Sequence, residues 1–88
     1  MCYENKIPRD SETVLKNAEY KRTKLEVKGA RVYKKGKYYY HRDTLHGGKS
    51  AHLEVYDKRG KHIGKANPNT GEIIPNTAVS GRKIKLWY

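Results

Sequence analysis

From Leu25 onward, apolar and polar residues alternate in short runs separated by glycine, proline and asparagine. A period of two places successive side chains on opposite faces of an extended chain, and it is typical of antiparallel strands with one buried face. Turn-forming residues separate the runs, among them Gly29, Gly36, Gly60 and the segment 67–71. The alternation therefore predicts an antiparallel sheet with strands at 25–27, 30–33, 37–41, 49–56, 61–66, 72–74 and 83–87.

Before this region, the sequence predicts one short helix at 12–20. Asp10 or Ser11 can cap its N-terminus, and its basic last turn suits the helix dipole. Its apolar residues share one face, and these are Val14, Leu15 and Ala18. Because so short a helix persists only when it is packed, we expect an α+β fold in which the helix packs on a highly twisted antiparallel β-sheet.

The chain of 88 residues predicts a single domain, with 1–24 as lead-in and helix and 25–88 as the sheet. The whole chain has only fifteen valine, isoleucine and leucine residues and no phenylalanine, so eight tyrosines and one tryptophan must add apolar area to the core. We expect modest stability, increased by a bound partner. Cys2 is the only cysteine, which excludes an internal disulfide and a thiolate metal site. No apolar run resembles a membrane span or a signal peptide, which predicts a soluble, cytosolic setting without membrane binding.

The chain carries 20 lysine and arginine residues against 9 acidic residues, a formal charge of +11. This charge is distributed along the whole sequence instead of being confined to a tail. A phosphate backbone is the partner that such a surface favours, with fast and salt-sensitive association. On charge alone, a non-catalytic basic protein, for example one associated with the ribosome, is a more common explanation than an enzyme.

Alternation sorts the side chains of the central hairpin into two faces. His52, Glu54 and Tyr56 point to one face, and the apolar residues between them point to the other. If 58–60 is a three-residue loop, Tyr56 lies opposite His62, which then joins the face of Glu54. We therefore expect one apolar side of the sheet under the helix and one side lined by histidine, glutamate, tyrosine and arginine.

Four residues have the chemistry that cleavage of RNA without a cofactor requires. Glu54 suits the base that removes the ribose 2′-hydroxyl proton, and His46 suits the acid that protonates the departing 5′-oxygen. Asp43 can hold the imidazole of His46 in one tautomer, and Arg82 can clamp the phosphate with two parallel hydrogen bonds. Because the nucleophile is a 2′-hydroxyl, such a site acts on RNA and not on DNA.

RNA contacts and metal binding are the remaining candidate roles. Three consecutive tyrosines at 38–40 cannot all face inward, so at least one ring is expected to stack on a base or contact phosphate. Our candidates for RNA contacts are Tyr39, Tyr40, Lys49 and Tyr56.

Zinc binding by the histidines His41, His46, His52 and His62 is disfavoured, since no pair has the spacing of a compact site. We expect no cofactor and no metal ion, although a metal-dependent nuclease remains a third class to test.

At these residues the sequence resembles a known family. The region 40–86 is similar to the C-terminal cytotoxic domain of the ribosome-inactivating ribonuclease colicins, and to toxin tips of contact-dependent inhibition systems that share that fold. The matching segments are Asp43-Thr-Leu-His46, Leu53-Glu-Val-Tyr56, Lys58-Arg-Gly-Lys-His-Ile-Gly64, Asn67-Pro-Asn-Thr-Gly71 and Arg82-Lys-Ile-Lys85. The resemblance covers about half of the chain, in order.

The resemblance implies a metal-independent endoribonuclease that cleaves small-subunit ribosomal RNA in the decoding region, with an acidic immunity protein as its inhibitor. It implies action in the cytoplasm of a target bacterium, after release from a larger secreted or surface-delivered toxin. The family's catalytic set corresponds to Asp43, His46, Glu54 and Arg82. The unmatched N-terminal forty residues could direct the same chemistry to transfer RNA or another RNA.

One spacing departs from the family pattern. Colicins place the glutamate four residues after the histidine, whereas Glu54 lies eight residues after His46. The segment Gly47-Gly48-Lys49-Ser50 predicts a loop extension between them. His52, two residues before Glu54, is therefore an alternative residue for part of the catalytic role. His62 matches a family histidine of secondary importance.

Overall fold

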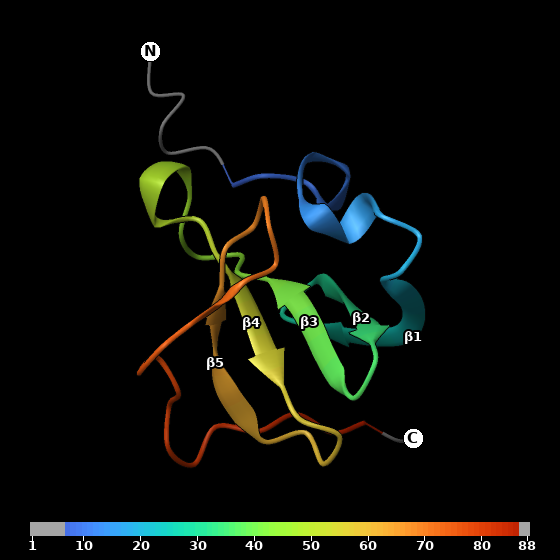
Figure 1. Cartoon of the computed structure of the whole chain (residues 1–88), viewed down its shortest axis with the longest axis vertical. Coiled ribbons are helices and arrows are strands. Elements are labelled where there is room, and N and C mark those ends of the chain that lie inside the picture. Colours follow the sequence, from blue (N-terminus) through green and yellow to red (C-terminus); the bar gives the residue numbers. More distant parts are fainter. Residues whose placement is uncertain (1–6, 87–88) are drawn as a thin grey trace.

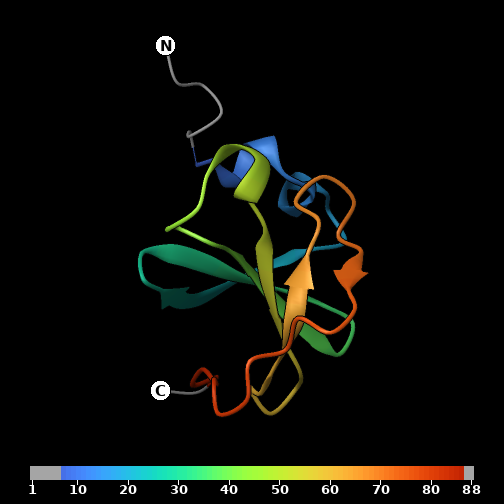
Figure 2. The same ribbon diagram turned by 90° about the vertical axis from the view of Figure 1, so that its left-hand side faces the viewer.

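A computed structural model describes residues 7–86, which form one six-stranded antiparallel sheet (Figure 1). Consecutive strands are neighbours throughout the sheet. They are β1 (Lys21–Val27), β2 (Ala30–Lys35), β3 (Tyr38–Arg42), β4 (Leu53–Tyr56), β5 (His62–Ala66) and β6 (Ile73–Ile74). In Figure 2 the β1–β2 hairpin runs across the direction of β4 and β5, so the sheet has the strong twist that we expected.

The expectation of an α+β fold is wrong, because the predicted helix at 12–20 does not form. The N-terminal segment contains only two 3-10 turns, η2 (Asp10–Glu12) and η3 (Val14–Lys16), and no α-helix occurs within 7–86. Both turns lie beside one end of the sheet in Figures 1 and 2. In this described region, no helix has the length and apolar character needed to cross a membrane.

Thr13 explains why the two turns do not merge into a helix. It lies between them in an extended conformation, with φ −124° and ψ 177°. Its hydroxyl accepts the N–H of Leu15 at 3.1 Å and donates to the carbonyl of Asp10 at 2.9 Å. Such local bonds between side chain and backbone compete with the hydrogen bonds of an α-helix.

The apolar side of the sheet still packs against the N-terminal segment. Leu53 and Val55 of β4 are fully buried, as alternation predicted, and Leu15 of η3 is 2% exposed. The complete buried cluster consists of Val14, Leu15, Tyr20, Tyr40, Leu53, Val55 and Ala66. Tyr20 and Tyr40 meet edge to face, with ring centroids 5.2 Å apart. Tyrosines thus provide part of the core, as expected from the absence of phenylalanine.

The register of the central strands brings the predicted polar face together, and it includes the pairing of Tyr56 with His62 that the turn at 58–60 predicted. His41 of β3 pairs with Glu54 of β4, and Tyr39 pairs with Tyr56. Across the next hairpin, Tyr56 pairs with His62. The titratable side chains therefore gather on the face opposite to the hydrophobic core.

Most element boundaries differ from the expected ones by one or two residues, and the larger differences occur at three places. The predicted strand 49–56 is divided into a 3-10 turn η4 (Gly48–Ser50) and the shorter β4. The predicted closing strand 83–87 is reduced to a single bridge between Lys83 and Lys61. β1 begins at residue 21, inside the segment that we had assigned to the lead-in and helix. Cys2 and Trp87 lie outside the described residues.

An ion pair ties the N-terminal segment to the sheet next to the polar face. The carboxylate of Asp10 accepts a hydrogen bond from Arg42 Nε at 2.8 Å and another from the Tyr33 hydroxyl at 3.0 Å. Arg42 ends β3, immediately before Asp43. The contact therefore holds the end of the strand from which the candidate site begins.

Candidate active site

The polar face of the sheet opens into a pocket of about 300 Å³. The four residues predicted to cleave RNA, Asp43, His46, Glu54 and Arg82, all line it. His52 lines it as well, whereas His62 lies beneath it, with its side chain fully buried. Strands, loops and the C-terminal segment each contribute to the wall, so the pocket exists only in the folded chain.

Asp43 and His46 form a dyad at the mouth of the pocket. Nδ1 of His46 donates to Asp43 Oδ2 at 2.5 Å, which leaves Nε2 of the ring for another partner. The Asp43 side chain is 10% exposed and that of His46 is 56% exposed. Burial opposes ionisation of Asp43, but the hydrogen bond from His46 and the nearby His52 outweigh it and lower the pKa of Asp43.

The segment between His46 and Glu54 does not carry His46 away from the site. It folds into η4, where Ser50 N–H donates to the Gly47 carbonyl at 3.1 Å. The chain then returns to β4, and Asp43 N–H donates to the carbonyl of His52 at 3.0 Å. The rings of His46 and His52 consequently lie 5.6 Å apart, centroid to centroid. The loop extension at 47–50 therefore forms a turn beside the pocket, and His46 stays close to the other site residues.

Glu54 lies at the floor of the pocket between two histidines. Its Oε2 contacts His52 Nε2 at 2.8 Å, and its Oε1 contacts His62 Nε2 at 2.6 Å. Burial raises the pKa of Glu54, but the hydrogen bonds from His62 and His52 exceed this effect and the pKa is lowered. The buried carboxylate is therefore ionised at neutral pH.

Hydrogen-bond partners define the protonation of these two histidines. Nδ1 of His62 accepts the N–H of Val79 at 2.9 Å, so the ring proton is on Nε2 and the neutral form satisfies both contacts. His52 differs, because Nδ1 faces the Ser50 carbonyl at 2.9 Å and Nε2 faces Glu54. Both are acceptors, so only a doubly protonated ring donates to both. A charged His52 thus fits the space between two carboxylates, with Asp43 Oδ2 3.7 Å from its Nε2.

Arg82 brings a cation from the C-terminal segment. Its Nη1 lies 3.6 Å from Glu54 Oε1, and its side chain is 44% exposed, so the guanidinium can contact a ligand in the pocket. The backbone places it: His62 N–H donates to the Arg82 carbonyl at 3.0 Å, and Ile84 N–H donates to the Gly60 carbonyl at 2.8 Å. The C-terminal segment passes beside the β4–β5 hairpin loop in Figures 1 and 2.

A second pair, His41 and Tyr56, was not identified from sequence as a unit. Nδ1 of His41 donates to the Arg42 carbonyl at 2.9 Å, and the Tyr56 hydroxyl donates to His41 Nε2 at 3.0 Å. Burial lowers the pKa of His41, while burial and the charge of Glu54 raise the pKa of Tyr56 to about 12. Their common face was a usable signal, since alternation already placed His41 with Asp43 and Tyr56 with Glu54.

The residues predicted to contact RNA are dispersed. Tyr56 lines the pocket but is only 2% exposed, and Tyr40 is a core residue with no open ring face. Tyr39 is partly buried on β3, with Lys34 Nζ 5.6 Å from its ring centroid. Lys49 is exposed on η4. Lys28, at the β1–β2 turn, also lines the pocket, although the sequence did not indicate it as a site residue. Its carbonyl accepts a hydrogen bond from the Thr44 hydroxyl at 3.4 Å.

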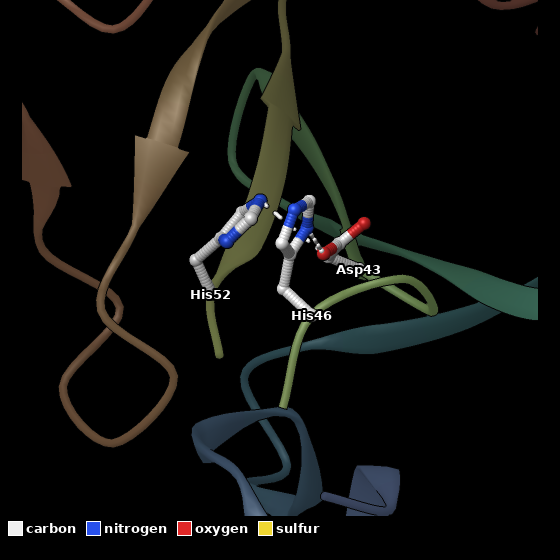
Figure 3. Close-up of side chains that lie close together, drawn as sticks. All are labelled: Asp43, His46 and His52. Carbon is white, nitrogen blue, oxygen red and sulfur yellow. Dashed lines mark hydrogen bonds and ion pairs between the residues drawn. The ribbon is translucent and has the colours of Figure 1, made fainter. Parts of the chain in front are cut away.

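The arrangement offers both proton-transfer groups and metal ligands. An ionised carboxylate, an exposed imidazole held by a second carboxylate, and a guanidinium surround one cavity. Asp43, His46 and His52 each present a ligand atom, and these atoms all lie within 4.8 Å of one another (Figure 3). Spacing along the sequence did not predict this group, because the fold brings the three residues together across the η4 turn.

Comparison with known families agrees with a toxin. The family model described as Cytotoxic matches residues 8–85, well beyond the half of the chain in which we noted a resemblance. The protein therefore belongs to this family of cytotoxic domains. Searches of curated proteins and of solved structures found no match.

Proposed function

From this family membership and the geometry of the pocket, we propose that the chain is a toxin domain that kills by cutting RNA as a metal-independent endoribonuclease. The observation that carries the proposal is the Asp43–His46 dyad, which opens into the same cavity as Glu54 and Arg82. Four residues spread over half of the sequence converge there, in a chain of formal charge +11. A polyanion is attracted to such a surface, and an acid, a base and a cation are then available at one phosphate.

In the proposed reaction, Glu54 takes the proton of the ribose 2′-hydroxyl while the 2′-oxygen forms a bond to phosphorus. The bond from phosphorus to the 5′-oxygen breaks, and His46 gives its proton to that oxygen. The products are a 2′,3′-cyclic phosphate and a free 5′-hydroxyl. Asp43 holds the imidazole of His46, and Arg82 neutralises the charge that develops on the phosphorane.

The lowered pKa of Glu54 has two consequences for this mechanism. The carboxylate is already ionised at neutral pH, which is the state that a base requires. It is also a weaker base than an unperturbed glutamate, because basicity falls with pKa. Positioning of the two reacting groups and the charge of Arg82 are therefore expected to provide most of the acceleration.

The proposed substrate is small-subunit ribosomal RNA in the intact ribosome, on the strength of the resemblance to ribonuclease colicins. DNA is not a substrate because it lacks the attacking hydroxyl. The proposed setting is the cytoplasm of a target bacterium, reached from a larger secreted or surface-delivered toxin. An acidic immunity protein is the partner expected to cover the basic pocket in the producing cell.

The test is incubation of the domain with intact ribosomes and with total RNA, in EDTA, followed by mapping of the new ends. We expect one cut in the small-subunit RNA that leaves a cyclic phosphate. His46→Ala and Glu54→Gln should abolish the cut and retain most RNA binding. Glu72→Gln is the matched control, because Glu72 is exposed on a loop outside the pocket, and it should cut normally.

Three outcomes would change the proposal. Cuts in anticodon loops would redirect the same chemistry to transfer RNA. Salt-sensitive binding without any cut would identify a non-catalytic RNA-binding module. Full activity of His46→Ala or Glu54→Gln would refute the assigned roles, whichever RNA is cleaved.

A further inference from the structure

We propose that Asp43, His46 and His52 form a binding site for a divalent transition-metal ion such as Zn²⁺, and that the bound ion inhibits the toxin. The group offers one carboxylate oxygen and two imidazole nitrogens within 4.8 Å (Figure 3). Zinc prefers this donor set and binds nitrogen and oxygen at about 2.0–2.2 Å. Two ligands on one tetrahedral ion therefore lie roughly 3.4 Å apart.

The two buried members of the group already have nearly this separation. Asp43 Oδ2 and His52 Nε2 are 3.7 Å apart, with side chains 10% and 8% exposed. The backbone hydrogen bond from Asp43 N to His52 O, at 3.0 Å, holds the two residues together. His52 is also oriented from behind, because its Nδ1–H donates to the Ser50 carbonyl at 2.9 Å. Histidine ligands of metal ions are usually fixed by such a second hydrogen bond, which directs Nε2 at the ion.

His46 supplies the third ligand and the route of entry. Its Nδ1 is 2.5 Å from Asp43 Oδ2, so the ring must move outward by roughly 1 Å for an ion to lie between them. The side chain is 56% exposed and stands at the pocket mouth, so this movement displaces no core residue. Three protein ligands leave one position of a tetrahedral ion open to water or to a phosphate oxygen.

Binding of the ion would remove the groups that the proposed function uses, and this step rests on that function. The ion takes the place of the proton between His46 Nδ1 and Asp43, so His46 releases its Nδ1 proton and His52 its Nε2 proton to solvent when they bind. His46 is then a ligand and no longer an acid, while Glu54 loses its hydrogen bond from His52. Arg82, Lys28 and Lys65 also line the pocket and repel a dication, so we expect moderate affinity and easy removal by a chelator.

The ligand atoms determine which metal ions the site selects. Imidazole nitrogen suits Zn²⁺, Cu²⁺ and Ni²⁺, whereas Mg²⁺ prefers oxygen ligands and retains its waters. Magnesium, which accompanies ribosomes and RNA, should therefore not occupy the site. The inference predicts a toxin that is insensitive to Mg²⁺, inhibited by Zn²⁺ and restored by EDTA.

Binding is tested without RNA, so that the result is independent of the proposed activity. Tag-free, EDTA-stripped Cys2→Ser protein, which removes the only thiol, is titrated with ZnCl₂ in a calorimeter, with MgCl₂ as the control ion. We expect one Zn²⁺ per chain, no heat from Mg²⁺, and affinity weakened at least about tenfold in His46→Ala and Asp43→Asn. Asp57→Asn, at a partly exposed turn carboxylate outside the site, should bind Zn²⁺ like the parent, because an asparagine oxygen can still accept the turn's backbone hydrogen bonds. Thermal unfolding without metal establishes that each variant is folded.

Equal Zn²⁺ affinity in the parent and in His46→Ala would overturn the site, as would a stoichiometry other than one. In the ribosome assay, Zn²⁺ should suppress cleavage at the concentrations that saturate the calorimetric site, and EDTA should restore it. Activation by Zn²⁺ would overturn the inhibitory role. Stoichiometric Zn²⁺ binding by a chain that cleaves no RNA would leave the metal site standing and refute only the proposed ribonuclease.

Discussion

Replacement of Gly60 by alanine should disturb the pocket without replacing any residue that lines it. Gly60 has φ +85°, a conformation that alanine adopts only with strain. An added Cβ would lie 2.1 Å from the carbonyl oxygen of Ile84. That oxygen belongs to the backbone of the C-terminal segment, which must therefore move by roughly 1 Å to regain van der Waals separation. Arg82 lies in the same segment.

Two contributions determine how much Gly60→Ala lowers the free energy of unfolding. The left-handed conformation costs alanine roughly 1–2 kcal/mol relative to glycine. Displacement of the segment weakens two backbone hydrogen bonds, from Ile84 N to Gly60 O and from His62 N to Arg82 O. Each contributes about 0.5–1.5 kcal/mol. We expect Gly60→Ala to lower the free energy of unfolding by about 2–5 kcal/mol.

Gly36→Ala is the matched control. Gly36 also has a positive φ, +61°, but nothing lies within 4 Å of its added Cβ. It should therefore lose only the conformational contribution, roughly 1–2 kcal/mol. Urea denaturation of both variants measures the difference, and Tm should differ by about 4–8 °C for each kcal/mol.

RNA cleavage provides a second readout, measured at a temperature where both variants are folded. A shift of about 1 Å in a positioning group can reduce a rate by up to about 10²-fold. Gly60→Ala should accordingly cleave ribosomal RNA much more slowly than Gly36→Ala. Equal free energies of unfolding for the two variants, within about 0.5 kcal/mol, would show that the Ile84 contact does not position the segment.

Three other perturbations test the packing and electrostatics. Asp10→Ala removes two hydrogen bonds between the N-terminal segment and the sheet, those to Tyr33 of β2 and Arg42 of β3, and calorimetry should show a loss of about 1–3 kcal/mol in the free energy of unfolding. Leu53→Ala, at a fully buried position, should lose about 2–5 kcal/mol in urea melts, whereas Leu45→Ala, at a 68% exposed position, should stay within about 0.5 kcal/mol. Because the pKa of Glu54 is lowered by folding, its contribution to stability is present above its unfolded pKa, about 4.3, and is lost as pH falls through the folded pKa. Unfolding followed against pH should show this acid loss in the parent and a smaller one in Glu54→Gln.

Alternation predicted most of the sheet because it records which face of each strand is buried. Leu53 and Val55 were assigned to the apolar side and are fully buried, and the pairing of Tyr56 with His62 followed from the length of one hairpin loop. The helix prediction was wrong because it relied on Val14 and Leu15 sharing a helical face. Periodicity does not describe the hydrogen bonds of the Thr13 hydroxyl to nearby backbone, which compete with those of a helix. In addition, Val14 N–H donates to the carbonyl of Pro68, a contact outside the range of any local pattern.

The sequence by itself determined the antiparallel sheet, the basic charge and the residue types at the polar face, since these depend on local alternation and composition. Only the tertiary structure decided which of those residues meet. Asp43 reaches His46 and His52 because η4 returns the chain to the sheet, and Arg82 reaches Glu54 because the C-terminal segment is hydrogen-bonded beside Gly60. The tautomers of the histidines were decided at the same level, because the donor or acceptor that the fold places against each ring nitrogen determines whether that nitrogen carries a proton.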